Sequence, residues 1–438
     1  MINIIRKLQR VQPAAMRHLL AHNIRPYTRI LQSICAQEEI WNTTQGDYMK
    51  WWRERETMRF SVHVAAGQCQ VLAASPRAEI ELYQGPMTEH EFLEETTVAC
   101  PQSDFSGECV ITIDPTMQHQ ATLIEFLRRE GVLNYRVGQP GEEGDFFLAA
   151  AELDPLLAPV YERMMQHIDQ PVPTDVAAVM EIVRQKLAQR GLPLLRVWYH
   201  PRINGRVMMA VFSPRYDVDR AISNMARIRR LERRFGVEST FYIRAFCPFY
   251  ADADVEELAS KPWCPEIALH GEFLTNSRVY GDEFRAAVAE RAHLERTAGV
   301  RVEGVGMHGG ELTKNRTATT SAVTAATALH YDTTPRPYYG NYLPSRRLVN
   351  GKFSNTFGLP HSLSDVEIDV NAHYGKTFYT ATMQMMREIR EANGVFVLMV
   401  HPEYFGFFSY LARPANLRAL LHYMMGYIRG RQSSEVTA

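Results

Sequence analysis

The sequence predicts a mixed α/β protein with a distorted (β/α) barrel in its carboxy-terminal half and a smaller α+β domain before it. The main observation is a pattern repeated from about residue 190 to 430. In each repeat a short β-prone run ends in a polar or histidine-bearing tip, and a helix follows. Six or seven such units in about 230 residues fit a barrel better than a doubly wound sheet, although spacing alone leaves both open.

The tips of these runs carry carboxylates and histidines. They are Asp217 and Asp219 after the run at 207–213, His270 in EIALHGEF, His308 in VEGVGMHGG, Asp332 in ALHYDTT and His401 in VFVLMVHPEYF. The carboxyl ends of barrel strands meet on one face, which is where barrel enzymes keep their chemistry. Carboxylates and imidazoles gathered there favour a metal-assisted hydrolase.

The length of 438 residues predicts more than one domain. We expect amino-terminal helices at 1–56, a small α+β accessory domain at 57–170 and the barrel at 171–438. Within the accessory domain, alternation at 57–84 predicts a small antiparallel sheet, and a strand–helix–strand pattern follows at 108–137. The helices expected after it are 174–190, 220–235, 253–260, 281–298, 316–328, 373–393 and 413–429, and another is expected at 1–24. The accessory domain carries no readable motif, so covering the barrel, shaping a cleft or dimerising all stay open.

Charge and composition limit the classes of binding partner and the compartment that we expect. The net charge of -1, from 48 basic and 49 acidic residues, argues against nucleic acid or an anionic membrane. The six cysteines include no CxxC pair and fit a reducing compartment. The amino terminus lacks the apolar core of a signal peptide, and no run approaches the roughly 20 apolar residues of a membrane span. We therefore expect a cytoplasmic protein, and leave a homo-oligomer open.

The carboxy-terminal half resembles the NodB-homology polysaccharide deacetylases (carbohydrate esterase family 4), and is most similar to a divergent branch whose first motif reads DVD. The motifs occur in order over residues 190–430: WYHPRINGRV, YDVDRA, EIALHGEF, GVGMHGG, LHYDTT, GLPHSLSD and VLMVHPEYF. The resemblance implies a NodB-like distorted barrel of about seven strands. It also implies a deacetylase that uses one divalent metal ion, usually zinc, to remove an acyl group from a sugar. The substrate that it implies is a small molecule or an oligosaccharide.

The segment 25–56, RPYTRILQSICAQEEIWNTTQGDYMKWWRER, resembles the last helix, strand and helix of such barrels. Our hypothesis is that this unit is circularly permuted to the front of the chain and that its strand at 38–44 pairs with the strand at 207–213. Such pairing would cover backbone groups that an open barrel edge exposes. The alternative is the remnant of a duplicated domain that packs elsewhere.

The resemblance implies a role for each matching residue. Asp217 would be the general base, Asp219 and His270 metal ligands, and His401 the general acid that protonates the leaving nitrogen. The alternatives are that the two aspartates cap a helix beginning near Arg220 and that His401 is a core histidine at a strand end.

Two positions depart from the family pattern. Leu274 stands where the second metal-binding histidine is usual, so His308 is our candidate for the third ligand and Glu272 the second candidate. Gly306 stands where an arginine usually orients the catalytic aspartate, and Arg215 is a candidate substitute.

Other polar or aromatic residues could contact substrate. The set that we expect there is Arg215, Glu272, Asp332 and Tyr404. Asp332 and Asp365 fall on strand ends, where they would orient His401, bind a sugar hydroxyl or cap a helix.

The sequence therefore favours a metal-dependent deacetylase that acts on an acylated amino sugar or glycan precursor. One alternative is a related hydrolase of a non-sugar amide, because barrel scaffolds host many chemistries. Another is a catalytically inactive barrel used for glycan binding or assembly, which Leu274 and Gly306 favour.

Overall fold

The structure, a computed structural model, describes most of the chain between residues 24 and 402. The described residues are 24–57, 60–65, 68–73, 78–84, 98–99, 109–129, 135–139, 141–144, 146–166, 173–189, 195–264, 266–309, 317–334, 343–350, 352–359, 361–365 and 376–402. The helix predicted at 413–429 and nearly all of that predicted at 1–24 lie outside these ranges.

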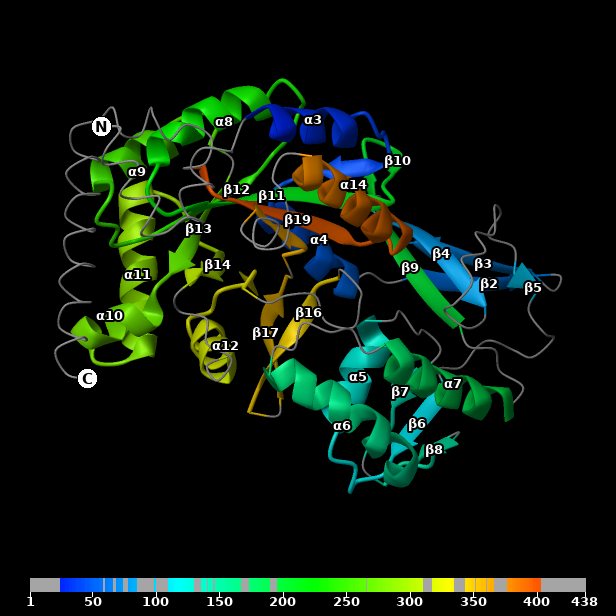
Figure 1. Ribbon diagram of the computed structural model, residues 1–438. Coiled ribbons are helices and arrows are strands. Elements are labelled where there is room, and N and C mark those ends of the chain that lie inside the picture. Colours follow the sequence, from blue (N-terminus) through cyan, green and yellow to red (C-terminus); the bar gives the residue numbers. More distant parts are fainter. Residues whose placement is uncertain are drawn as a thin grey trace.

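A ten-stranded sheet forms the centre of the molecule (Figure 1). Its order is β16 (Ser345–Val349), β17 (Lys352–Gly358), β15 (Tyr331–Asp332), β14 (Gly304–Met307), β13 (Glu266–Gly271), β12 (Thr240–Ile243), β11 (Ala210–Val218), β19 (Val395–Val400) and β18 (Leu363–Ser364), with β1 (Ile40–Asn42) beside β11. All neighbours are parallel except β16 and β17. The predicted α/β class is therefore confirmed, and the parallel-dominated, curled sheet is consistent with the expected distorted barrel. Within the described residues, β16 and β18 do not pair with each other, so the sheet is a half-barrel there.

Strand β1 brings the amino-terminal segment into this sheet. Trp41 pairs in parallel with Val211, whose other edge pairs with Val395 of β19. Since β12 begins its pairing with β11 only at Arg215, β1 and β12 occupy the same edge of β11 in succession. The expected pairing between the segments 38–44 and 207–213 is present, and a circular permutation remains our prediction for its origin.

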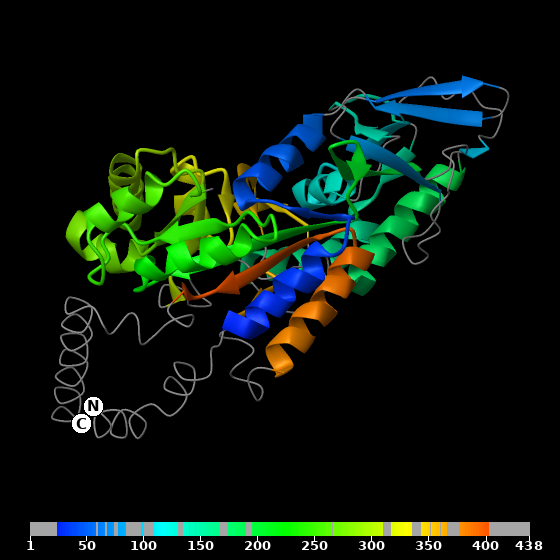
Figure 2. The ribbon, with the colours of Figure 1, turned by 90° about the horizontal axis from the view of Figure 1, so that it is seen from above.

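The two faces of the sheet are both buried, which suits parallel strands. Helices α3 (Ile24–Cys35), α8 (Met225–Glu232), α9 (Asp252–Ala259), α11 (Glu283–Ala298) and α14 (Lys376–Glu391) cover the outer face over the main core. Figure 2 shows α3 and α14 side by side, where Ser33 and Tyr379 share a hydrogen bond of 2.9 Å. Helix α4 (Gln45–Thr57) packs Tyr48, Trp51 and Trp52 on the inner face instead.

The helix predicted at 220–235 is divided into a 3-10 turn, η1 (Ile222–Asn224), and α8. The helix predicted at 281–298 is confirmed as α11, and α10 (Phe273–Tyr280), which was not among the predicted helices, precedes it. Gly281, with φ +94°, ends α10, and Asp282 caps α11 by accepting from the Arg285 backbone N–H. Helix α12 (Thr317–Ala326) matches its prediction closely. In the described part of the chain, none of the helices is long and apolar enough to cross a bilayer.

A small α/β unit follows the amino-terminal segment. Strands β6 (Cys109–Ile113), β7 (Tyr135–Val137) and β8 (Phe146–Leu148) form a parallel sheet in the order β7-β6-β8. Helices α5 (Gln120–Arg129), α6 (Ala150–Gln166) and α7 (Pro173–Gln189) complete a separate apolar core. The predicted strand–helix–strand unit is present.

The antiparallel sheet predicted at 57–84 is confirmed for its first two strands and wrong for the third. Strands β2 (Phe60–Ala65) and β3 (Gln68–Ala73) form a hairpin, and β3 also pairs with β5 (Val98–Ala99). The third strand, β4 (Ala78–Gln84), pairs instead with β9 (Leu195–Ile203), which forms a hairpin with β10 (Arg206–Val207). Alternation predicts a strand but not its partner, and here the partner lies more than a hundred residues away.

Candidate metal centre

The alternation of β11 places its functional residues on one face. Val211 belongs to the inner core and Phe212 to the outer one, so odd-numbered side chains point inward along this strand. Arg215 and Asp217 therefore share the inner face. The strand continues to Val218, so Asp217 lies within it and not after its end, as the run predicted at 207–213 implied.

Neither aspartate caps a helix. The 3-10 turn η1 begins after Ala221, which makes no side-chain cap hydrogen bond, and α8 follows from Asn224 with none either. The helix-capping alternative for Asp217 and Asp219 therefore has no support in the geometry.

Three side chains from three strand ends converge at this face. Asp219 follows β11, His270 lies in β13 and His308 follows β14, and one ligand atom from each lies within 4.8 Å of the others. His270 Nε2 is 3.1 Å from Asp219 Oδ1, and His308 Nε2 is 3.5 Å from the same oxygen. These are the three residues that the sequence suggested as ligands, brought together from a span of 90 residues.

The hydrogen bonds behind both rings fix which nitrogen faces Asp219. His270 Nδ1 lies 2.8 Å from the carbonyl oxygen of Gly306, which can only accept, so Nδ1 carries the hydrogen. His308 Nδ1 lies 3.0 Å from Glu272 Oε1 and donates in the same way when the ring is neutral. Each neutral ring then directs an Nε2 lone pair toward Asp219.

This arrangement fits a cation. Asp219 Oδ1 and His270 Nε2 are buried, and neither makes a hydrogen bond with any described residue. Two acceptors that face each other across 3.1 Å repel unless a proton or a cation lies between them. A divalent ion bound by one carboxylate and two imidazoles would satisfy all three lone pairs, and this donor set is one that catalytic zinc uses.

The pKa shifts of Asp219 and His308 also fit a cation between the three side chains. Burial raises the pKa of Asp219, but its contacts with His270 and His308 outweigh burial and hold the pKa well below its ordinary value. Burial alone lowers the pKa of His308, whereas contacts with Asp219 and Glu272 raise it to about 9. The carboxylates of Asp219 and Glu272 therefore favour a positive charge at the position that the three ligand atoms surround.

Asp217 is held by Arg215. Nε and Nη2 of the guanidinium donate to the two carboxylate oxygens at 2.6 and 2.9 Å, and Nη1 donates to Thr333 O and Oγ1 at 2.7 and 2.8 Å. The guanidinium also lies 4.4 Å from the centre of the Tyr242 ring. Burial is the largest single influence and raises the pKa of Asp217, but the charges of Arg215, His270 and His401 and the Arg215 hydrogen bond together lower it more. The net shift is therefore downward and favours the carboxylate.

Gly306 provides room for that guanidinium. A Cβ atom built on Gly306 would lie 2.5 Å from Arg215 Nη2, which is closer than real Cβ contacts come. A side chain at position 306 and the guanidinium of Arg215 would thus occupy the same space.

His401 is oriented by Asp365. The Asp365 carboxylate accepts from His401 Nδ1 at 2.7 Å and from the His401 backbone N–H at 2.8 Å. The ring is thereby fixed with Nε2 as the nitrogen not bound to Asp365. His401 lies near enough to Asp217 and Asp219 for its charge to help lower their pKa values.

The residues expected to contact substrate make contacts within the protein. Arg215, Glu272 and Asp332 are all buried and engaged with other side chains, and contact with substrate remains a prediction for them. Asp332 accepts from Arg347 Nη2 at 2.5 Å and from the Thr334 backbone N–H at 2.8 Å, and neither contact orients His401. Tyr404 lies outside the described residues.

Two residues near the candidate metal centre were not identified from the sequence. Thr333 binds the far side of Arg215, and Arg244 binds Glu272. A signal existed for both, since Arg244 directly follows β12 and Thr333 directly follows β15, at the same strand ends that carry the other site residues.

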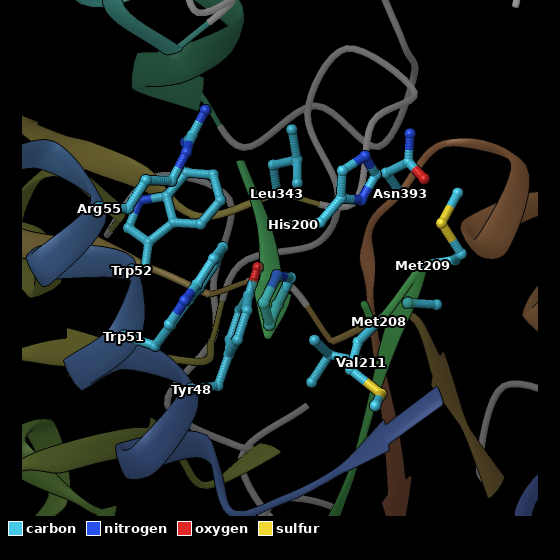
Figure 3. Close-up of a pocket in the computed structure, with 12 residues that line it drawn as sticks. Tyr48, Trp51, Trp52, Arg55, His200, Met208, Met209, Val211, Leu343 and Asn393 are labelled. Carbon is cyan, nitrogen blue, oxygen red and sulfur yellow. The ribbon is translucent and has the colours of Figure 1, made fainter. Parts of the chain in front are cut away.

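A separate pocket lies at the opposite end of β11 (Figure 3). Tyr48, Trp51 and Trp52 of α4 line it together with His200 and Val211. Its interior holds about 10 Å³, roughly the room of a single water molecule. It is too small for a substrate, and Val211 lies at the amino end of the strand that carries Asp217.

Comparison with known proteins gives distant structural likenesses. No protein-family model matches the chain, and no curated protein matches it. A solved protein from Mycobacterium smegmatis described as a polysaccharide deacetylase is 18% identical over 50% of this chain and 84% of its own, with a TM-score of 0.36. One from Bordetella bronchiseptica, described as a polysaccharide deacetylase involved in O-antigen biosynthesis, is 16% identical over 47% and 74%, with a TM-score of 0.32. The Puue allantoinase is 15% identical over 50% and 84%, with a TM-score of 0.33. Likenesses this distant do not assign the chain to a family.

Proposed function

We propose that this protein is a metal-dependent deacetylase, which hydrolyses the amide C–N bond of an acylated amino sugar or glycan precursor. The observation that carries the proposal is the convergence of Asp219, His270 and His308 beside two further oriented groups, Asp217 and His401. A site with three ligands, a base and an acid has the parts that amide hydrolysis needs.

Asp219, His270 and His308 would hold one divalent ion, with zinc as the expected metal. When bound, such an ion lowers the pKa of a water molecule and polarises the acyl oxygen. Three protein ligands leave a coordination position open for water or substrate, as in catalytic zinc sites.

Asp217 is the proposed general base. Its Oδ2 lies 3.7 Å from His270 Nε2, so the carboxylate borders the space that the ligand atoms face. The two bonds from Arg215 fix its orientation and keep it ionised, and an ionised carboxylate can accept the proton of the attacking water.

His401 is the proposed general acid. Because Asp365 accepts from Nδ1, the proton that the ring can transfer resides on Nε2. Donation of that proton to the departing nitrogen converts a poor leaving group into an amine. The carboxylate behind the ring stabilises the imidazolium form before transfer.

The amino-sugar substrate rests on the ordered motifs of the sequence. The geometry itself supports amide hydrolysis without distinguishing a sugar from another acylated amine. We also keep the domain boundaries, the cytoplasmic location and the small-molecule or oligosaccharide partner as proposals.

Acetate release tests the proposal. The zinc-loaded protein is incubated with N-acetylglucosamine, its oligosaccharides and a panel of simple N-acetyl amines, beside Asp217→Asn and His401→Gln. We expect the wild-type protein to release acetate from the sugars. The kcat of each variant should be at least about 100-fold lower than that of the wild type. His330→Gln is the control, because His330 precedes β15 at the far end of the sheet and pairs with Glu303. Release of acetate from the simple N-acetyl amines alone would mean that the substrate is an amide other than a sugar. No release from any substrate would favour the inactive-barrel alternative.

A further inference from the structure

We propose that Arg244 and Glu272 form a positioning pair that holds His308 as the third metal ligand, in place of the histidine that Leu274 replaces. This inference rests on the proposed metal centre. It assigns roles to two buried charges that the proposed reaction does not otherwise use.

The pair is a two-bond ion pair at the carboxyl ends of β12 and β13. Arg244 Nε and Nη2 donate to Glu272 Oε2 and Oε1 at 3.0 and 2.8 Å. The two side chains are 10% and 9% exposed. Paired donors in this fork geometry fix the carboxylate plane as well as its position, and burial removes the competition from water.

Glu272 in turn fixes the ring of His308. Its Oε1 accepts from His308 Nδ1 at 3.0 Å, on the side of the ring opposite to Asp219. His308 needs this support, because it lies beyond the end of β14 and its side chain is 29% exposed. The backbone N–H of His308 donates to Gly271 O at 2.9 Å, which holds the main chain but leaves the ring free to rotate.

Arg244 also reaches the first ligand. Its Nη1 donates to the backbone oxygen of Asp219 at 3.2 Å, and its own backbone N–H donates to the Tyr250 hydroxyl at 2.9 Å. One guanidinium therefore touches the main chain of Asp219 directly and the ring of His308 through Glu272. Glu272 itself follows His270 by two residues, so the pair connects all three ligands.

Leu274 explains why such a pair is needed. A histidine at that position would stand in the first turn of α10, where a helix would fix it. His308 has no helix of its own in the described residues around it, so its ring must be oriented by a neighbouring side chain. A carboxylate that accepts a hydrogen bond from the nitrogen of an imidazole that does not bind the metal commonly raises metal affinity by about 10- to 100-fold.

Glu272 is a positioning residue and not a ligand in this arrangement. Oε1 faces His308 Nδ1 and Arg244, and Oε2 faces Arg244. The set of converging ligand atoms contains Asp219, His270 and His308 without it. Glu272, our second candidate for the third ligand, thus accepts a hydrogen bond from the ligand His308 and does not itself face the metal position.

The test is the zinc dissociation constant, measured by competition with a chromophoric chelator on the full chain. We expect Glu272→Gln to weaken binding about 10-fold or more, and the double variant Arg244→Met/Glu272→Met to weaken it by up to about 100-fold. The double variant removes both charges together, so neither is left buried without its partner. The control is Glu257→Gln, which breaks an exposed ion pair between Glu257 on α9 and Lys261 just after that helix.

A positioning role of Glu272 predicts a second result. Adding Glu272→Gln to His308→Gln should weaken zinc binding no further than His308→Gln alone, since Glu272 acts through that ring. An unchanged dissociation constant in both pair variants, with wild-type zinc binding intact, would overturn the inference and leave the proposed function standing. Absence of zinc binding by the wild-type protein would overturn the proposed function as well.

Discussion

The guanidinium of Arg215 occupies the space that a side chain at position 306 would fill. A Cβ on Gly306 would lie 2.5 Å from Nη2 and 2.7 Å from Cζ of Arg215. The arginine that holds Asp217 is therefore on the same strand as Asp217, and the glycine on β14 is its steric counterpart. The absence of an arginine at 306 does not leave Asp217 without a cation.

Gly306→Ala should displace Arg215 and so misplace Asp217. We expect a kcat about 100-fold lower, because a shift of about 1 Å in a catalytic group has that order of effect. Zinc content should be unchanged, since the His270 contact at Gly306 is with the backbone oxygen. Steady-state kinetics and metal analysis check both. Gly309→Ala is the matched control, because a Cβ there meets nothing within 4 Å. Equal loss in both variants would contradict the steric relationship.

Arg215→Met should destabilise the fold by about 3–5 kcal/mol, because it leaves the Asp217 carboxylate buried without its cation. Adding Asp217→Asn should restore part of that loss, since the remaining amide carries no charge. Urea unfolding of the metal-free protein gives both free energies. A double variant as unstable as the sum of the two single changes would show that the residues are not energetically coupled.

Asp365→Asn should impair His401 without affecting metal binding. The carboxylate that accepts from Nδ1 would become an amide, which orients the ring less well and cannot stabilise the imidazolium. We expect kcat to fall by about 10- to 100-fold, within the range of general acid–base effects. An unchanged kcat would remove His401 from the proposed mechanism.

The stability of the metal-free protein should depend on pH through Asp332. Burial raises the pKa of Asp332, but the Arg347 charge and two bonds from Thr334 lower it more, so the folded pKa lies below the unfolded one of about 3.9. The stabilisation is therefore complete above the unfolded pKa and is lost as pH falls through the folded value. Urea unfolding from pH 6 to pH 3 should show the difference between wild type and Asp332→Asn shrinking as the pH falls. A constant difference would contradict the assigned shift.

The sequence predicted the parts of the site that depend on strand order. Asp219, His270 and His308 could be grouped because each follows or ends a β-prone run, and parallel strands bring such ends to one edge. The same reasoning placed Asp217 with Asp219. It did not find that β11 continues through Asp217, because the run SPRYDV is not apolar enough to be distinguished from a turn.

Contacts between side chains from separate strands could not be predicted. Arg215 was a candidate substitute for the family arginine, but its fit against Gly306 depends on the spacing of β11 and β14 in three dimensions. The Arg244–Glu272 pair likewise needs the register of β12 and β13. The pairing of β4 with β9 escaped for a similar reason, since local alternation carries no information about a distant partner.

Metal stoichiometry tests the central claim most directly. Purified wild-type protein, reconstituted with zinc and freed of excess, is analysed by mass spectrometry beside Asp219→Asn, His270→Gln and His308→Gln, with His330→Gln as the control. We expect one zinc per chain in the wild type and the control, and loss of the ion in each of the three ligand variants. A wild-type protein that binds no divalent ion after reconstitution, or a zinc that remains in all three variants, would contradict the assignment of this site.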